Sequence, residues 1–325
     1  MLKEIYPDIW LIEVPLPKSP LRYLNSYLIK GEGSHLLIDT GFNCPESEGY
    51  LRRCISDIGV DIKDLDIFLT HSHSDHTGLA GKLISPGRTI FTSREALLNI
   101  NRLTSQESSK AIFKEAHLLG FKEKLNYYLD IHPGLKFSND SQIKAQIIDD
   151  KHPFKIGVYE FLSLSAPGHA PGMMCLYEKN HKILFSGDHI LDKITPNISC
   201  WSLNTNPLRD YFQSLQKVAD LPVNTAFSSH RGIITNFKER VETLRKHSLD
   251  RLDEVRDILS SHKALTPYEL ASKLTWNVPQ DRWEDIHPVQ HWFATGEAMA
   301  NLTFLYHMNE VSLASDVPYT FTLNI

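Results

Sequence analysis

The sequence predicts an α+β protein with a small helical C-terminal part, and three observations support this. Short apolar or alternating runs typical of strands recur through residues 1–236, with amphipathic helical segments between them. From residue 237 the composition shifts to charged helix and ends in a strand-like stretch, 311–324. A histidine-rich turn at 70–78 joins a buried strand to a helix. We therefore expect one domain at 1–236 and a second domain at 237–325.

Composition and charge argue against a nucleic-acid-binding, disulfide-stabilised or membrane-spanning protein. The chain has 325 residues, 42% of them hydrophobic, and a formal net charge of −5, which gives no bulk attraction to nucleic acid but leaves a local basic patch open. Its cysteines (Cys44, Cys54, Cys175 and Cys200) form no Cys-x-x-Cys pair, so neither a thiolate zinc site nor a disulfide framework is indicated. The start lacks the apolar core of a signal peptide, and no apolar run is long enough to cross a bilayer. We expect a cytoplasmic protein that does not enter a membrane.

The first half of the chain predicts strands, helices and a helical insertion. Residues 5–14, 24–30 and 34–39 predict three strands of a meander that ends in Asp39-Thr40-Gly41. The following segments predict a helix at 46–58, a buried strand at 65–70, a short helix at 78–84 and a strand at 89–92. Residues 95–129 are rich in helix formers and in apolar residues such as Leu125, Tyr127 and Tyr128, which predicts two or three helices.

The second half of the chain also predicts strands and helices, and its C-terminal part is mainly helical. Strands are predicted within 144–164 and at 182–188, an amphipathic helix at 206–220, and a strand and loop at 224–232. The C-terminal part predicts helices at 237–261, 265–274 and 288–308. Thr266 is the expected N-cap of the second of these, and Pro267 lies in its first turn, where a missing N–H costs nothing.

The turn at 70–78, Thr-His-Ser-His-Ser-Asp-His-Thr-Gly, contains side chains that can bind metal ions. His71 and His73 are two residues apart, so an extended backbone places both imidazoles on the same side. Asp75 and His76 follow after the chain has begun to turn, so they can point at a second place nearby. Neutral imidazole and carboxylate oxygen both suit zinc. The arrangement favours two adjacent divalent metal ions, with zinc as the default and iron or manganese compatible with similar ligands.

This nonapeptide resembles the His-x-His-x-Asp-His signature of the metallo-β-lactamase superfamily of metal-dependent hydrolases. The resemblance implies an αββα sandwich and extends to later segments. Pro167-Gly168-His169-x-x-Gly172 is similar to the second signature, so His169 is expected to join His71 and His73. Asp188, nineteen residues further on, corresponds to the residue that bridges the two metals, and His230 is expected to join Asp75 and His76.

The resemblance also leaves some assignments open. Asp39 corresponds to an aspartate beneath the metal site that could orient a ligand, but an ordinary turn aspartate before glycine is an equal alternative. The family usually has Pro-Gly-His-Gly where this chain has Ser-Ser-His230-Arg231-Gly, so the neighbours of His230 differ. Arg231 is either an anion contact or a solvated surface residue. The insertion at 95–129 lies where the superfamily often places a lid, and simple packing against the sheet is the alternative.

The implied activity is hydrolysis without a serine or cysteine nucleophile. Two metal ions can hold a bridging hydroxide, with Asp75 as both a ligand and the proton acceptor. An aspartate at 188, instead of cysteine, argues against β-lactamase activity. A small ester or thioester is the expected substrate, as in glyoxalase II-like members. A lactone is a close alternative, and a phosphodiester or RNA is another. A metal-binding redox or regulatory module is disfavoured because the ligand set is complete.

The C-terminal helices and strands resemble the winged-helix module that follows the catalytic domain in the branch containing β-lactamase-like protein 2. A DNA- or RNA-reading helix should offer Arg and Lys to phosphates and base edges. The helix at 288–308 instead has an apolar face that includes Met299, Leu302 and Leu305. We expect it to serve packing or formation of a homodimer. His189, His287 and His291 are expected to lie outside the metal site.

Overall fold

The computed structural model describes residues 1–105, 107–121, 132–280 and 282–324. The chain forms two compact units. The first comprises Met1–Ser105, Pro133–Pro196 and Ser214–Val241, and the second comprises Gln106–His132, Asn197–Gln213 and Glu242–Ile325. Within the described ranges, no helix is both long and apolar enough to span a membrane. The predicted boundary at residues 236 and 237 stays a prediction.

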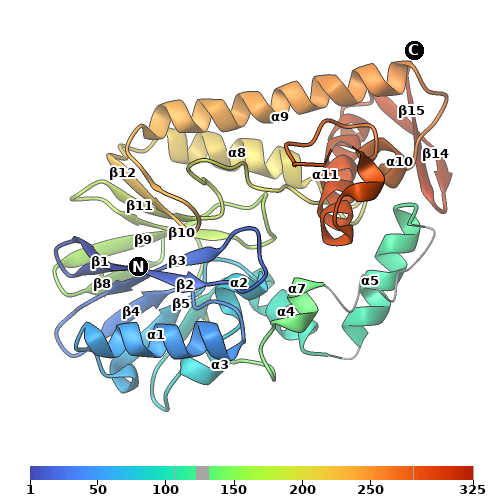
Figure 1. Ribbon diagram of the computed structural model, residues 1–325. Helices are drawn as coiled ribbons and strands as arrows, with labels where there is room; N and C mark the ends of the chain where they lie inside the picture. The colour runs from blue at the N-terminus through green and yellow to red at the C-terminus, as the bar shows by residue number, and fades with distance from the viewer. Residues whose placement is uncertain (106, 122–131, 281, 325) are drawn as a thin grey trace. The chain divides into compact units, whose positions relative to one another are not determined.

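Two mixed β-sheets form the centre of the first unit (Figure 1). The seven-stranded sheet runs in the order β1 (Leu2–Tyr6), β2 (Ile9–Pro15), β3 (Tyr23–Ile29), β4 (His35–Ile38), β5 (Leu65–Phe68), β6 (Ile90–Thr92) and β7 (Gln146–Ile147). The six-stranded sheet runs in the order β13 (Ile233–Ile234), β12 (Thr225–Ser228), β11 (Ile183–Gly187), β10 (Met174–Glu178), β9 (Tyr159–Ser165) and β8 (Pro153–Ile156).

A buried apolar layer between the sheets holds them face to face. It includes Tyr27 and Phe68 from the larger sheet and Phe161, Phe185 and Phe227 from the smaller one. The ring of Tyr27 stacks on that of Phe227, with centroids 5.5 Å apart. Because alternate strand residues point to opposite faces, the same strands present a second apolar face outward. These sheets and the helices that cover them confirm the predicted sandwich architecture.

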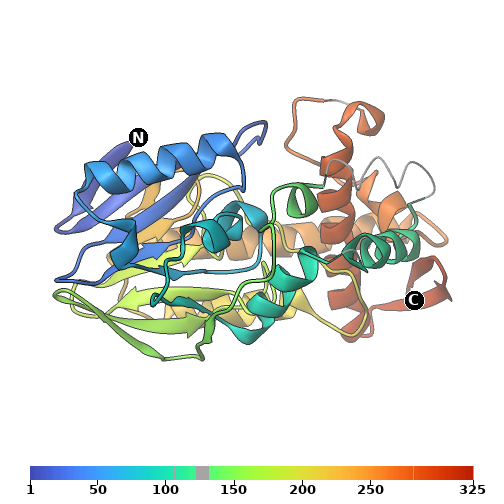
Figure 2. The same cartoon turned by 90° about the horizontal axis from the view of Figure 1, so that it is seen from below.

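Helices cover the outer face of the larger sheet. Helix α1 (Pro45–Asp57) buries Leu51, Cys54 and Ile55 against it, and Figures 1 and 2 both show this helix lying along the strands. The short helices α2 (Ser74–Thr77) and α3 (Ala80–Leu83) follow β5, and α4 (Arg94–Leu103) and α7 (Pro133–Lys136) also belong to this unit. Helix α8 (Pro207–Ala219) and helix α9 (Phe237–Ser260) each begin in one unit and end in the other.

The second unit contains most of α9, with α5 (Glu107–Leu118), α10 (Pro267–Ala271), α11 (Pro288–His307), β14 (Val311–Asp316) and β15 (Tyr319–Leu323). The predicted N-cap is confirmed as part of a capping box, because the Thr266 side chain accepts from the N–H of Glu269 and the Glu269 side chain accepts from the N–H of Thr266. Helix α11 buries residues around most of its circumference, including Trp292, Met299 and Leu302, as a packing helix does. A winged-helix arrangement and a homodimer stay predictions.

Several local predictions were wrong or incomplete. Residues 5–14 are not one strand, because Pro7-Asp8 turns the chain and Asp8 has φ 57°. Strands β10 and β13 and helices α2 and α7 were missed. They are short elements buried or fixed by tertiary contacts, so their own periodicity is weak. The insertion at 95–129 contains α4 and α5 in its described part, while Leu125, Tyr127 and Tyr128 lie outside the described residues.

Candidate metal centre

Every proposed ligand lies in the segment that follows a strand. His71 and His73 lie in the turn after β5, Asp75 and His76 lie in the short helix α2 that comes next, His169 follows β9, Asp188 follows β11, and His230 follows β12. Strands β4 and β5 are parallel, and so are β11 and β12. Because parallel strands present their carboxyl ends at the same edge of a sheet, each sheet brings its loops together there, as ligand sites in such sheets require.

The structure brings the seven side chains into three overlapping groups whose potential ligand atoms lie within 4.8 Å of one another. One group is His71, His73 and His169. Another is His71, His76 and Asp188, and the third is Asp75, His76 and His230. His71 is common to the first two groups and His76 to the last two, so the groups outline neighbouring positions. His189, His287 and His291 are in none of these groups among the residues that the structure describes.

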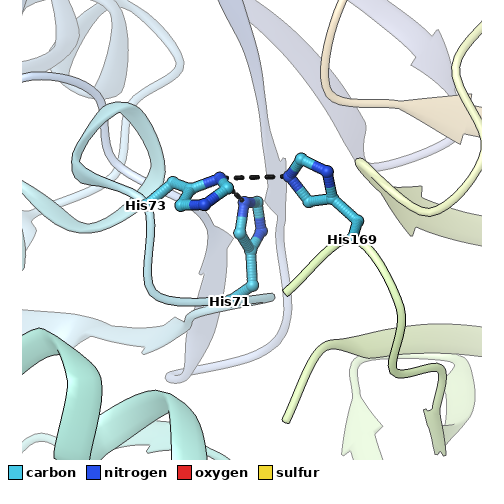
Figure 3. Close-up of side chains that lie close together, drawn as sticks. All are labelled: His71, His73 and His169. Carbon is cyan, nitrogen blue, oxygen red and sulfur yellow. Dashed lines mark hydrogen bonds between the residues drawn. The ribbon is translucent and has the colours of Figure 1, made fainter. Parts of the chain in front are cut away.

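The first position is formed by three imidazoles that point at a common centre (Figure 3). His73 Nδ1 lies 3.0 Å from His71 Nε2 and 3.0 Å from His169 Nε2. Burial, reinforced by the neighbouring histidines, holds the pKa of His71 well below its ordinary value. His73 is an exposed residue, but desolvation of its ring beside His169 lowers its pKa to about 3. These rings are therefore neutral at pH 7, the state in which imidazole binds a metal.

The second position has a different charge balance. His230 Nε2 lies 3.3 Å from Asp75 Oδ2 and 3.6 Å from Asp188 Oδ1, and His76 Nε2 lies 3.6 Å from Asp188 Oδ2. Burial opposes a charge on His76, but the carboxylates of Asp188, Asp39 and Asp75 outweigh it and raise the pKa of His76. In the same way, burial disfavours the charged form of Asp75, but His76 and His230 lower its pKa to about 2. The carboxylates thus attract positive charge to this point.

Unsatisfied polar atoms test whether these residues fit a metal. His76 Nε2, Asp188 Oδ1 and His230 Nε2 are buried and have no hydrogen-bond partner within the described part of the chain. Buried polar atoms of this kind normally find a partner, because leaving one unpaired costs about 1–3 kcal/mol. A cation coordinated by these atoms would satisfy all three, so the residues fit divalent metal ions.

Asp39 is placed to orient His76. Its Oδ2 accepts from His76 Nδ1 at 2.7 Å and from Thr70 Oγ1 at 2.8 Å, while its Oδ1 accepts from the Thr70 N–H at 2.9 Å. With the proton on Nδ1, His76 presents the lone pair of Nε2 to the metal position. Asp39 has φ 60°, a left-handed conformation that aspartate tolerates better than most residues. Asp39 therefore both forms a turn and contacts the proposed ligand His76.

Several residues that support the ligands were not predicted from the sequence. Thr70 contacts both Asp39 and His71 Nδ1, the latter at 3.0 Å, and its position inside the histidine-rich turn was the available signal. The Tyr23 carbonyl accepts from His230 Nδ1 at 2.8 Å, which leaves His230 Nε2 to face the metal position. Asn25 donates to the carbonyls of Ser228 and Arg231 on either side of His230. No local pattern at 23–25 predicts these contacts, since they join segments more than 200 residues apart.

A glycine permits the close approach of the two halves of the centre. Gly187 has φ 54°, and a Cβ there would lie 2.8 Å from Met173 Cε and 3.1 Å from Thr70 Cβ. The N–H of Met174 also donates to the Thr70 carbonyl at 2.8 Å. Glycine at 187 therefore lets Asp188 turn towards the histidines that follow β5.

Comparison with known proteins agrees with this fold. Residues 20–90 and 145–230 match the sequence model of the family described as "Metallo-beta-lactamase superfamily", and these ranges contain all seven proposed ligands and Asp39. A solved structure of a metallo-beta-lactamase family protein from Thermus thermophilus is 25% identical. It has a TM-score of 0.83, with 99% of this chain and 100% of that chain covered. A beta-lactamase domain protein from Burkholderia ambifaria, 23% identical over 99% of this chain and 93% of that chain, has the same fold with a TM-score of 0.81.

Similar curated proteins come from bacteria, an animal and a fungus. The "Probable metallo-hydrolase YqjP" of Bacillus subtilis is 25% identical over 82% of this chain and 85% of that protein. The "Beta-lactamase-like protein 2 homolog" of Caenorhabditis elegans is 23% identical over 80% of this chain and 73% of that protein. The "Atrochrysone carboxyl ACP thioesterase nsrC" of Aspergillus novofumigatus is 23% identical over 69% of this chain and 54% of that protein.

The fold and the clustered histidines and aspartates define a metal-binding hydrolase domain. The chain belongs to the metallo-β-lactamase superfamily, and within it the chain is a metal-dependent hydrolase.

The contacts of Asp39 generate a testable prediction. In Asp39→Asn, an amide NH₂ would replace one oxygen that now accepts from His76 or Thr70, so the proton of His76 would no longer be held on Nδ1. We expect the affinity for one metal ion to fall about 10–100-fold, the usual effect of losing such a partner, with the fold retained. The measurement is a competitive zinc titration against a chelating dye.

The matched control is Asp66→Asn. Asp66 lies on β5 and accepts from the Thr89 N–H and the Ser34 hydroxyl, outside the metal centre. It should bind zinc as the unchanged protein does. Equal zinc affinities for Asp39→Asn and the unchanged protein would show that Asp39 is only a turn residue.

Proposed function

We propose that this chain is a hydrolase with two metal ions that cleaves a small thioester or ester. The observation that carries the proposal is the convergence of seven potential ligands on two adjacent positions, with buried nitrogen and oxygen atoms that lack hydrogen-bond partners among the described residues. His71, His73 and His169 would hold one ion. Asp75, His76 and His230 would hold the other, and Asp188 would bridge the two. Zinc is the metal we expect for this set of imidazoles and carboxylates.

Two bound ions would supply a bridging hydroxide at neutral pH and would polarise the oxygen of the bond to be cleaved. The chain's own residues then have to position the substrate and move a proton. Asp75 makes its contacts to His230 and His76 through Oδ2, at 3.3 and 3.7 Å. We assign Asp75 Oδ1 to accept the proton of the attacking water.

Two considerations support a carbonyl substrate. Several similar proteins are named as acyl-carrier-protein thioesterases, including those from Aspergillus novofumigatus and Emericella nidulans. Aspartate at position 188 offers a hard oxygen ligand, instead of the thiolate that we associate with β-lactam cleavage. Lactones react by the same kind of carbonyl attack. A phosphodiester or RNA is the alternative that the test below has to separate.

Four further expectations from the sequence complete the proposal. They are the winged-helix nature of the C-terminal elements, the lid role of 95–129, a homodimer and a cytoplasmic location. The substrate is expected to be a small molecule, with nucleic acid disfavoured by the few cations on α11.

The substrate class is tested by initial rates of the zinc-loaded protein on a mixed panel. The panel holds acyl thioesters, lactones, a bis-nitrophenyl phosphodiester and single-stranded RNA, and Asp188→Ala is the inactive control. We expect turnover of the thioesters that disappears in Asp188→Ala, because this variant lacks the bridging carboxylate. Turnover confined to RNA or the phosphodiester would contradict a carbonyl substrate.

The role of Asp75 is tested by comparing rate and metal content in Asp75→Ala. If Asp75 accepts the proton as well as binding metal, kcat should fall about 10²-fold or more, while bound zinc falls much less. Thiol release from a thioester and zinc per chain are measured on the same preparation. Asp57→Ala, an exposed aspartate at the end of α1, should change neither quantity. Parallel losses of kcat and zinc would reduce Asp75 to a ligand.

A further inference from the structure

Three exposed cations lie on two loops that meet beside the metal centre. Lys18 and Arg22 are in the loop between β2 and β3, and Arg231 directly follows the proposed ligand His230. We call these three residues the cationic rim. The carbonyl of Tyr23, the residue after Arg22, accepts from His230 Nδ1 at 2.8 Å. Both loops are thus attached to the same ligand.

Arg231 connects its own loop to the β2–β3 loop by hydrogen bonds. Its guanidinium donates to the carbonyl of Leu21 at 3.3 Å and to that of Pro20 at 3.2 Å. Within the β2–β3 loop, the N–H of Leu16 donates to the Arg22 carbonyl at 2.8 Å, and the N–H of Arg22 donates to the Ser19 carbonyl at 3.1 Å. Hydrogen bonds therefore hold the backbone that carries Arg22 in one conformation.

All three rim residues have a left-handed backbone. The φ angles are 62° for Lys18, 70° for Arg22 and 70° for Arg231. Glycine or asparagine would adopt this conformation at lower cost, and residues held in it cluster at functional sites. Asp39, beneath the metal position, also has this conformation, and Asp8, Lys151, Lys182 and Asn309 adopt it elsewhere in the chain. At the three rim positions the side chain is cationic although glycine would favour the backbone conformation.

The described residues do not neutralise the charges of the rim by ion pairs. Among the described residues, no carboxylate lies within ion-pair distance of Lys18, Arg22 or Arg231, although Lys82, Arg88 and several cations of α9 have such partners. The guanidinium of Arg231 donates to backbone carbonyls. Lys18 and Arg22 are therefore the rim residues that can bind an anion from solution. The β2–β3 loop contacts His230 at Nδ1, on the side away from the metal position, so its two cations favour a substrate that carries negative charge at some distance from the bond to be cleaved.

We propose that Lys18 and Arg22, in the loop fastened by Arg231, bind the phosphate of the phosphopantetheine arm that carries the acyl group. This inference rests on the proposed thioester hydrolysis and names its substrate class. Many acyl thioesters in cells are carried on this arm, either in coenzyme A or on a carrier protein, and both of these sources present phosphate. Because the contact is made before and during the reaction, the two cations should lower KM and leave kcat unaffected.

The experiment compares three substrates with the same acyl group: the coenzyme A thioester, the thioester of a phosphopantetheinylated carrier protein, and the N-acetylcysteamine thioester, which lacks phosphate. The variant is Lys18→Gln combined with Arg22→Gln. The matched control is Lys182→Gln, since Lys182 is also exposed and has φ 58°, but precedes β11 at the end of the strand opposite Asp188. Single-stranded RNA is included as a fourth substrate.

We expect the double variant to raise KM about tenfold for at least one phosphate-bearing thioester, with kcat and the N-acetylcysteamine reaction unchanged. The source whose KM rises identifies the carrier, and added salt should weaken the same reaction in the unchanged protein. Arg22→Gly should show a higher KM without a lower unfolding temperature, which separates binding from support of the fold.

Two results would overturn the inference in distinguishable ways. If all three thioesters are cleaved and the double variant changes none of their KM values, or changes them all equally, the rim does not recognise phosphate and the proposed thioester hydrolysis still stands. If the unchanged protein cleaves RNA and no thioester, the proposed function fails as well, and a rim variant that loses RNA cleavage would assign these cations to a nucleic acid.

Discussion

The protein keeps polar atoms buried without partners, and the rest of the structure is arranged around that constraint. His76 Nε2, His230 Nε2 and Asp188 Oδ1 face one another with no hydrogen-bond partner in the described part of the molecule. An unpaired buried polar group is costly, and a charged one is more so. Divalent cations would remove the cost at all of these atoms at once. The same atoms that destabilise the metal-free protein would therefore become its strongest interactions with a metal.

Holding such atoms in place requires support from both sheets. On the side of the larger sheet, Asp39 fixes His76 and contacts Thr70, which in turn contacts His71. Across the sandwich, β3 reaches the loop after β12 through Tyr23, Asn25 and Tyr27, whose hydroxyl donates to the Ser228 carbonyl at 2.7 Å. The buried aromatic layer between the sheets keeps these two sets of contacts in register. The site is thus a property of the packed sandwich instead of any one loop.

The sequence was sufficient for the parts that depend on local spacing. The grouping of His71, His73, Asp75 and His76 was predictable from their spacing after an apolar strand, although β5 ends at Phe68 and the helix that carries Asp75 and His76 was not predicted. The Thr266 cap was predictable for the same reason. The supporting contacts of Tyr23 and Asn25 were not, because they depend on tertiary pairing with a distant loop. Strand β10, fully buried, has no alternation to reveal it.

The central claim is that these residues hold two metal ions, and anomalous diffraction from a zinc-loaded crystal tests it most directly. We predict two zinc peaks about 3.5–4 Å apart. One peak should be bound by His71, His73 and His169, the other by Asp75, His76 and His230, with Asp188 between them. A single peak, or zinc bound away from these residues, would contradict this claim.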